Sequence, residues 1–317
     1  MLKVGIVGTG GISTSHLNGW ANIPEAELTA ACDIRPEQVD PVGEKYGCRV
    51  YYDLDEMLRQ ERLDVLDICL PTYLHADTAV KAIEQGLHVL TEKPISLHLH
   101  DVQRVYGAAK RKGVRVMVAQ VLRFWPEYVR LKEAYDRGVY GKLLSGSMTR
   151  LGNTPKWSWD DWMKDPERSG LVPFDLHIHD LDFMIYAFGA PAGVRCNRAG
   201  NERQDYLHVV YDYPGFFICA EAAWYDCDYA FAAGYRFQFE KAVMEFKAGT
   251  LTIYHQDGRV EVCGAEESAE ENGINLPKSN AYYNEIRYFT DCVLAGRDCE
   301  RVRPEELEAV LESIKKL

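Results

Sequence analysis

Short apolar runs alternate with helix-like segments over residues 1–120. The apolar, β-branched runs lie at 2–7, 27–33, 65–70, 88–91 and 114–119, and amphipathic segments lie between them at 13–22, 37–46, 75–85 and 101–112. Gly86 and Gly113 each follow a helix pattern, where a left-handed glycine commonly ends a helix. Asp53 is placed to cap a further short helix through Leu58. Repeated strand–helix units with apolar strands predict a parallel sheet with helices on both faces.

The pattern changes after Gln120. A helix pattern at 127–136, closed by Gly138, is followed by longer alternating runs at 143–150, 207–213, 216–224, 235–246, 251–254 and 259–262. Turns such as Pro214-Gly215 and Asp257-Gly258 separate these runs, which predicts a mainly antiparallel sheet. Two helix patterns, 282–294 and 304–316, complete the chain. We therefore predict an α/β protein with a parallel-sheet domain over 1–120 and an α+β domain with a large open sheet over 121–317.

Composition narrows the class of protein. The chain has 317 residues, of which 47% are hydrophobic and 26% charged, as in ordinary globular proteins. It contains no run of about 18 apolar residues, so no membrane partner is expected. The net charge of −12 repels phosphate backbones, which disfavours nucleic-acid binding. The start of the chain has no signal-peptide pattern and the nine cysteines form no CxxC motif, so we expect a cytoplasmic protein with reduced thiols.

A glycine-rich turn follows the first predicted strand and opens a helix. It reads Gly8-Thr9-Gly10-Gly11-Ile12-Ser13, which is GxGxxG with a serine in the last place. Such a turn lets backbone approach a diphosphate at a helix N-terminus, although an ordinary strand–helix turn looks similar. Asp33 ends the second strand, where a carboxylate accepts from the ribose hydroxyls and repels a 2′-phosphate. These residues predict NAD in preference to NADP, with Arg35 as the residue that can accommodate the phosphate.

Two further groups are candidates for chemistry. Glu92-Lys93-Pro94 follows the strand 88–91, and the carboxyl ends of parallel strands face the ligand crevice. An isolated lysine in such a turn would otherwise be a surface residue. Asp175 and His179 are four residues apart on a predicted helix that runs from Phe174 to Phe188. A carboxylate that orients an imidazole suits a general acid or base, and an ordinary helix pair is the alternative interpretation.

These motifs together resemble the Gfo/Idh/MocA family, the group of glucose–fructose oxidoreductase and inositol dehydrogenase. The matching residues are the glycine loop, Pro71-Thr72 with His75, residues 86–94, Arg123-Phe124 with Pro126, Gly138, Gly141-Lys142-Leu143, and Asp175 with His179. The resemblance implies a Rossmann domain followed by an open-sheet domain that binds substrate and forms a homodimer or homotetramer. It implies catalytic roles for Lys93, Asp175 and His179, and further cofactor contacts from Thr72, His75, Glu92 and Lys93. It also implies pocket contacts from Arg123, Tyr283 and Asn284.

His177 departs from the family pattern, which usually has glycine between the aspartate and the histidine. We expect His177 to line the pocket by its backbone or to pack against a dimer partner. His177, His179 and Asp182 are not expected to bind metal, because two histidines separated by one residue do not converge on a helix. Trp157 and Trp159 lie in the preceding loop, where aromatic faces could stack on a sugar ring or pack in the core.

Three functions are compatible with this sequence. The first is an NAD(P)-dependent dehydrogenase that oxidises a secondary alcohol of a sugar, polyol or cyclitol, or reduces the ketone. The second is an enzyme that retains NAD and uses transient oxidation for elimination or glycoside cleavage. The third is a cofactor-sensing regulator without turnover, which would need the glycine loop but not the proton relay. Fold alone does not decide among them.

Overall fold

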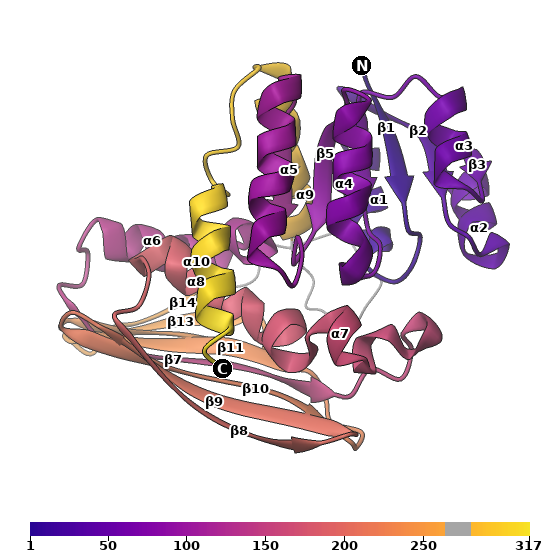
Figure 1. Ribbon diagram of the computed structural model, residues 1–317. Helices are drawn as coiled ribbons and strands as arrows, with labels where there is room; N and C mark the ends of the chain where they lie inside the picture. The colour runs from indigo at the N-terminus through magenta and orange to yellow at the C-terminus, as the bar shows by residue number, and fades with distance from the viewer. Residues whose placement is uncertain (264–279) are drawn as a thin grey trace. The chain divides into compact units, whose positions relative to one another are not determined.

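The computed structural model, which describes residues 1–263 and 280–317, separates into two units (Figure 1). The first unit contains Met1–Val121 and Ala281–Pro304, and the second contains residues 122–263, Asn280 and Glu305–Leu317.

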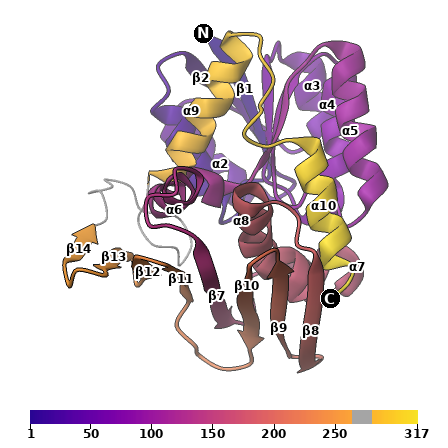
Figure 2. The same cartoon turned by 90° about the vertical axis from the view of Figure 1, so that its left-hand side faces the viewer.

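A six-stranded parallel sheet forms the centre of the first unit, in the order β3-β2-β1-β4-β5-β6. Its strands are β1 (Leu2–Val7), β2 (Ala26–Cys32), β3 (Arg49–Tyr51), β4 (Val65–Ile68), β5 (His88–Glu92) and β6 (Val116–Ala119). Its helices are α1 (Ser13–Ala21), α2 (Pro36–Tyr46), α3 (Leu54–Gln60), α4 (His75–Glu84), α5 (Leu99–Lys112) and α9 (Ala281–Leu294). Figure 2 shows α4 and α5 on one face of the sheet and α9 on the other. This is the Rossmann strand order, so the predicted fold of the first domain is confirmed.

Local signals in the sequence explain where these elements begin and end. The carboxylate of Asp53 accepts from the backbone N–H of Glu56 at 2.7 Å, which caps α3. Gly113 ends α5 with φ at +71°, a conformation that costs glycine little. Strands β1 and β4 are buried on both faces, as the continuous apolar runs indicate.

Helix α9 belongs to the first unit, which differs from the sequence-based boundary that placed all of 121–317 in a second domain. The helix packs against α1. Gly19 of α1 permits this approach, because a Cβ there would lie 2.4 Å from Cδ1 of Ile286. A contact between residues so distant in the sequence leaves no local pattern, so the sequence could not assign this helix.

An eight-stranded sheet forms the second unit, in the order β14-β13-β12-β11-β7-β10-β9-β8. Its strands are β7 (Leu143–Asn153), β8 (Gly193–Asn201), β9 (Gln204–Tyr213), β10 (Phe216–Tyr225), β11 (Ala232–Phe239), β12 (Ala242–Lys247), β13 (Thr250–His255) and β14 (Val260–Cys263). The β7–β10 pair is parallel and the other pairs are antiparallel. The mainly antiparallel open sheet is therefore confirmed.

Two details of this sheet differ from the prediction. The run 235–246 is two strands, β11 and β12, joined at the exposed pair Glu240 and Lys241. That turn contains no glycine or proline, so it carried no turn signal. Strand β8 was not predicted, because it is an edge strand that is mostly exposed and its residues do not alternate between apolar and polar.

Among the described residues, the α-helices of the second unit lie on one face of its sheet (Figures 1 and 2). They are α6 (Pro126–Asp136), α7 (Pro166–Ser169), α8 (Ile178–Phe188) and α10 (Pro304–Ile314). Ile218, Phe237 and Met244 point to this covered face and are fully buried. On the other face, no helix from the described residues covers the sheet. Within those same residues, no helix combines the length and apolar character needed to cross a bilayer.

Candidate active site

The turn between β1 and α1 has the geometry of a phosphate-binding loop. Gly8 has φ at +85°, and a Cβ there would lie 2.5 Å from the carbonyl oxygen of Cys69, so only glycine fits. A Cβ on Gly10 would meet no atom closer than Nη2 of Arg35, at 3.9 Å, so the space over this residue is open. Ser13 closes the loop, because its hydroxyl donates to the carbonyl oxygen of Gly10 at 2.6 Å. With Gly11 and Ile12 leading into α1, this open backbone surface at a helix N-terminus fits a dinucleotide diphosphate.

Asp33 follows β2 and is tied to the glycine loop. Its carboxylate accepts from the backbone N–H of Thr9 at 2.9 Å and from the Thr9 hydroxyl at 3.3 Å. The guanidinium of Arg35 reaches the same carboxylate with Nε at 3.0 Å and Nη2 at 2.9 Å. Burial alone would raise the pKa of Asp33, but the hydrogen bonds from Arg35 and Thr9 lower it overall. The structure therefore brings Thr9, Asp33 and Arg35 together beside the loop, as the cofactor prediction requires.

Thr72 and His75 lie after β4, at the same edge of the parallel sheet. Thr72 is buried in a short 3₁₀ helix, Thr72–Leu74. The two ring nitrogens of His75 lie 2.6 Å from the carbonyl oxygens of Pro94 and Leu70. Burial lowers the pKa of His75 in spite of these carbonyls. His75 thus links the turns that follow β4 and β5, and its contact to the cofactor stays a prediction.

Glu92 ends β5 and belongs to a buried chain of polar groups that the sequence reasoning missed. One carboxylate oxygen of Glu92 lies 3.1 Å from Nε2 of His16, and Nδ1 of the same ring lies 2.8 Å from the carboxylate of Asp67. The other oxygen of Glu92 accepts from the backbone N–H of Lys93 at 2.9 Å. The side chain of Lys93 is half-buried. A signal was present, because a carboxylate such as Asp67 in a strand buried on both faces requires a partner.

The ligand-type atoms of His16, Asp67 and Cys69 lie within 4.8 Å of one another, a spacing that could suit a metal ion. Both ring nitrogens of His16 are already engaged by carboxylates. Asp67 also accepts from the indole N–H of Trp20 at 2.7 Å. These hydrogen bonds account for the cluster without a cation.

Asp175 and His179 occupy a region where the helix geometry changes. Pro173–His177 form a π-helical turn, and α8 continues regularly from Ile178. The predicted helix is therefore present and ends at Gly189 as expected. Its first turn is a π-helical turn, which is wider than the α-helical turn that the sequence predicted. Such π-helical turns frequently occur at functional sites. Asp175 and His179 are both half-buried, whereas most of their neighbours in the helix are buried.

His177 is part of the core of the second unit. Its side chain is fully buried, and its Nε2 lies 2.6 Å from the hydroxyl oxygen of Tyr211, on β9. The two rings are stacked at 12° between planes. Burial, reinforced by the positive charge of Arg150, lowers the pKa of His177 to about 3. The prediction that His177 packs against a dimer partner is wrong, because its ring faces the sheet of its own chain.

Arg123 is also fully buried within the second unit. Its guanidinium donates to both carboxylate oxygens of Asp182, at 2.8 and 2.6 Å, and to Glu306. It lies over the ring of Tyr186, 4.7 Å from the ring centroid. The structure thus gives Arg123 an internal ion-pair role, and its contact to substrate stays a prediction.

The aromatic candidates before the π-helical turn are exposed. Trp157 is 66% exposed and Trp159 is 41% exposed. The alternative prediction, that both side chains pack in the core, is therefore wrong. Tyr283 and Asn284 are half-buried in the first turn of α9, which belongs to the first unit. Their roles toward substrate remain predictions.

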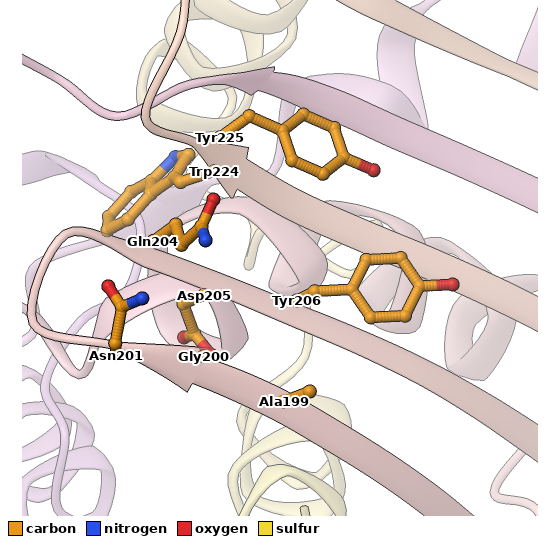
Figure 3. A pocket seen from close by; sticks show the side chains of 8 residues that line it. All are labelled: Ala199, Gly200, Asn201, Gln204, Asp205, Tyr206, Trp224 and Tyr225. Carbon is orange, nitrogen blue, oxygen red and sulfur yellow. The ribbon is translucent and has the colours of Figure 1, made fainter.

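A hollow of about 300 Å³ lies at one end of the strands β8, β9 and β10 (Figure 3). Figure 3 shows the rings of Tyr206 and Tyr225 pointing the same way and Trp224 standing on the other side. The carboxylate of Asp205, which also lines it, is held by Arg198 at 2.9 and 2.7 Å. None of the predicted site residues lines this hollow, so it is separate from the candidate chemistry.

Both halves of the chain match models of one protein family. Residues 2–120 match the model described as "Oxidoreductase family, NAD-binding Rossmann fold". Residues 128–270 match the model of the GFO/IDH/MocA C-terminal domain. Together the matches cover most of the chain.

Several similar proteins have names that describe an activity on a sugar or a polyol. The chain is 30% identical over 189 residues to myo-inositol 2-dehydrogenase of Thermotoga maritima, a match over 59% of this chain and 55% of that protein. It is 30% identical over 184 residues to 2,7-anhydro-N-acetylneuraminate hydratase of Mediterraneibacter gnavus, over 58% of this chain and 48% of that protein. The matches thus span about half the length of these relatives. A structure of levoglucosan dehydrogenase with NADH and levoglucosan superposes with a TM-score of 0.82 at 18% identity, over 99% of this chain and 97% of that one, which shows a shared fold.

Proposed function

The chain belongs to the GFO/IDH/MocA oxidoreductase family, and on that premise we propose that it is an NAD-dependent dehydrogenase of a sugar, polyol or cyclitol. The observation that carries the proposal is the carboxylate of Asp33 fixed against the open glycine loop, 2.9 Å from the backbone N–H of Thr9. This arrangement suits the ribose and diphosphate of NAD. The names of the relatives support a carbohydrate-like substrate.

The proposed chemistry divides between cofactor and protein. NAD, when bound, supplies the acceptor for the hydride. Lys93 donates a hydrogen bond to the reacting oxygen and stabilises the negative charge that develops there. His179 accepts the proton of the substrate hydroxyl, and Asp175 orients the imidazole and stabilises its charged form.

The first test is a search for substrate. The purified protein is incubated with sugars, polyols, cyclitols and sugar acids, with NAD and NADP in parallel, and reduction of the cofactor is followed by absorbance. We expect an alcohol that is oxidised faster with NAD than with NADP. No reduction with any substrate class, in a protein that binds NADH, would favour the sensing role instead.

The second test removes the proposed catalytic groups. Lys93→Ala should lower kcat while NAD binding persists, because the glycine loop and Asp33 are untouched. His179→Ala should lose roughly 10²–10⁴-fold, the usual contribution of a positioned acid or base, and Asp175→Asn should also lose activity. His100→Ala is the matched histidine control, since the side chain of His100 is 74% exposed on α5. Wild-type turnover in both Lys93→Ala and His179→Ala would contradict the mechanism.

A second candidate function is favoured by the relative named as a hydratase. In this version, NAD stays bound and transient oxidation serves elimination or glycoside cleavage, so no net NADH accumulates. Product analysis distinguishes the two, because this function gives product without a matching amount of reduced cofactor. Stoichiometric NADH formation excludes it.

We also propose that the uncovered face of the eight-stranded sheet is shared with a second copy of the chain. Cross-strand pairing puts Phe217, Val243, Tyr254 and Val260 in one row on this face. Phe217, Tyr254 and Val260 are 46%, 44% and 54% exposed. Apolar side chains gathered on an open face are typical of an association surface.

A further inference from the structure

Four buried side chains of the first unit form a continuous polar chain that the mechanism above does not use. Trp20 and His16 come from α1, Asp67 from β4 and Glu92 from the end of β5. Their exposed fractions are 2%, 0%, 0% and 7%. The indole N–H of Trp20 donates to Asp67 at 2.7 Å, and the ring of His16 bridges Asp67 at 2.8 Å and Glu92 at 3.1 Å. When every polar group in such a buried chain has a hydrogen-bond partner, the chain is held in a single arrangement.

The partners of His16 define its protonation state. An ionised carboxylate only accepts hydrogen bonds, so a ring that bridges two carboxylates donates from both nitrogens and carries a positive charge. Burial acts against that charge, but the attraction of Asp67 outweighs it and raises the pKa of His16 well above its ordinary value. Burial likewise acts to raise the pKa of Glu92, but the hydrogen bond and charge of His16 lower it overall.

The other titratable groups near the His16 ring do not replace it as the charged partner of Glu92. Burial raises the pKa of the Cys69 thiol to about 12, so that thiol is neutral. The ring of Tyr282, from α9, lies 6.1 Å from that of His16 between centroids. His75, on α4, also faces Glu92, and burial lowers the pKa of its ring although both ring nitrogens lie near carbonyl oxygens. Among the described residues, the positive charges that lower the pKa of Glu92 are His16 and Lys93.

The chain of contacts ends on the residue that carries the proposed chemistry. The carboxylate oxygen of Glu92 that does not face His16 accepts from the backbone N–H of Lys93 at 2.9 Å. The carboxylate is thus held at both oxygens, by His16 on one side and by the Lys93 peptide on the other. The direction of the Lys93 side chain depends on that peptide.

We propose that His16 is a positioning residue, which holds Glu92 between itself and the Lys93 peptide and so sets the direction of the Lys93 ammonium group. This inference rests on the proposed role of Lys93. The inference explains why the first unit contains a buried imidazole and a buried aspartate, although the glycine loop does not require either residue to bind a cofactor. A misdirected catalytic group is costly, since a displacement of about 1 Å can reduce a rate by roughly 10²-fold.

The central experiment compares His16→Gln with a matched control. His16→Gln keeps a polar side chain, but both of its N–H donors are on one nitrogen beside an amide oxygen, so it cannot span the two carboxylates as the ring does, and we expect kcat to fall about 10- to 100-fold. The Kd for NADH, measured by fluorescence titration, should stay within about twofold, because the loop Gly8–Gly10 is untouched. Trp20→Phe removes one hydrogen bond from the same buried cluster without touching the His16–Glu92 contact. It should lower the melting temperature and leave kcat within about twofold.

A double variant separates positioning from general destabilisation. If His16 acts through Lys93, His16→Gln should change kcat by less than about twofold when Lys93 is already alanine. The pH profile gives a second readout. Without His16, only Lys93 still lowers the pKa of Glu92 against the effect of burial, so that pKa rises and the acid limb of kcat should move to higher pH. A third readout is independent of activity, because ¹⁵N-histidine NMR at pH 8 should show N–H protons at both ring nitrogens of His16 with the signal absent in His16→Gln.

The outcomes distinguish the inference from the proposed function. If Lys93→Ala is impaired while His16→Gln has wild-type kcat, the inference is wrong and the proposed function stands. If Lys93→Ala itself has wild-type kcat, the proposed role of Lys93 fails first, and the inference that rests on it fails as well. An equal loss from His16→Gln in both backgrounds, or a singly protonated His16 ring at pH 8, overturns the inference. If His16→Gln does not fold, Glu92→Gln replaces it, and it should give the same loss of kcat and the same absence of further effect in Lys93→Ala.

Discussion

Replacing Arg35 by alanine should tighten the binding of NADH and weaken that of NADPH. The carboxylate of Asp33 accepts from five donors, namely the Thr9 N–H and hydroxyl and the backbone N–H, Nε and Nη2 of Arg35. A carboxylate has about four lone-pair positions, so a ribose hydroxyl must displace a donor. The Arg35 side chain is the one that can leave, because it is 24% exposed, whereas two of the other donors are backbone N–H groups and the Thr9 hydroxyl belongs to a buried residue.

The structure sets the size of the effect. The Arg35–Asp33 ion pair is partly exposed, and such pairs contribute about 0.2–1 kcal/mol. Removing this competition should tighten NADH binding by roughly 1.4- to 5-fold, since 1.4 kcal/mol corresponds to a factor of ten. NADPH loses a guanidinium partner for its 2′-phosphate, a charge-assisted contact of about 1.5–3 kcal/mol, and so should bind roughly 10- to 150-fold more weakly. The preference for NADH over NADPH should rise by at least about tenfold.

The assay is a fluorescence or calorimetric titration of both reduced cofactors at fixed ionic strength. Lys45→Ala is the matched control, because it removes one positive charge from the same unit while Lys45 lies over the ring of Tyr46 instead of Asp33. The control should leave the preference unchanged. Weaker NADH binding in Arg35→Ala, or an unchanged ratio of the two dissociation constants, would refute this account of Asp33.

Two further predictions concern the second unit. Arg123→Met should lower the free energy of unfolding by about 3–5 kcal/mol in urea denaturation, because Asp182 stays buried without its partner. Arg195→Met is the control at an exposed ion pair, and it should lower the free energy of unfolding by less than about 1 kcal/mol. Equal losses would contradict the structural role of Arg123. Light scattering at micromolar concentration should give a mass above the 36.1 kDa of one chain, and Phe217→Asp on the uncovered face should reduce that mass. A stable wild-type monomer would refute the proposal that the sheet is shared between two copies.

The candidate chemistry was only partly visible in the sequence. The glycine loop, Asp33 and Glu92-Lys93 follow strands directly, so strand order alone places them at one sheet edge. Asp67 and Glu92 lie 51 and 76 residues after His16, and only tertiary contacts join the three. The same applies to Arg123, whose partner Asp182 is 59 residues away. A sequence pattern shows that a polar residue lies in an apolar run, but not which distant group satisfies it.

The sequence by itself determined the alternation of strands and helices, the caps at Asp53 and Gly113, and the change of architecture after residue 120. These features depend on side-chain periodicity and on backbone preferences of single residues, which are local. Tertiary structure decided that α9 joins the first unit, that the helix carrying Asp175 and His179 begins with a π-helical turn, and that His177 faces its own sheet. Those outcomes depend on packing between distant segments, where the burial of one side chain is set by the shape and charge of another.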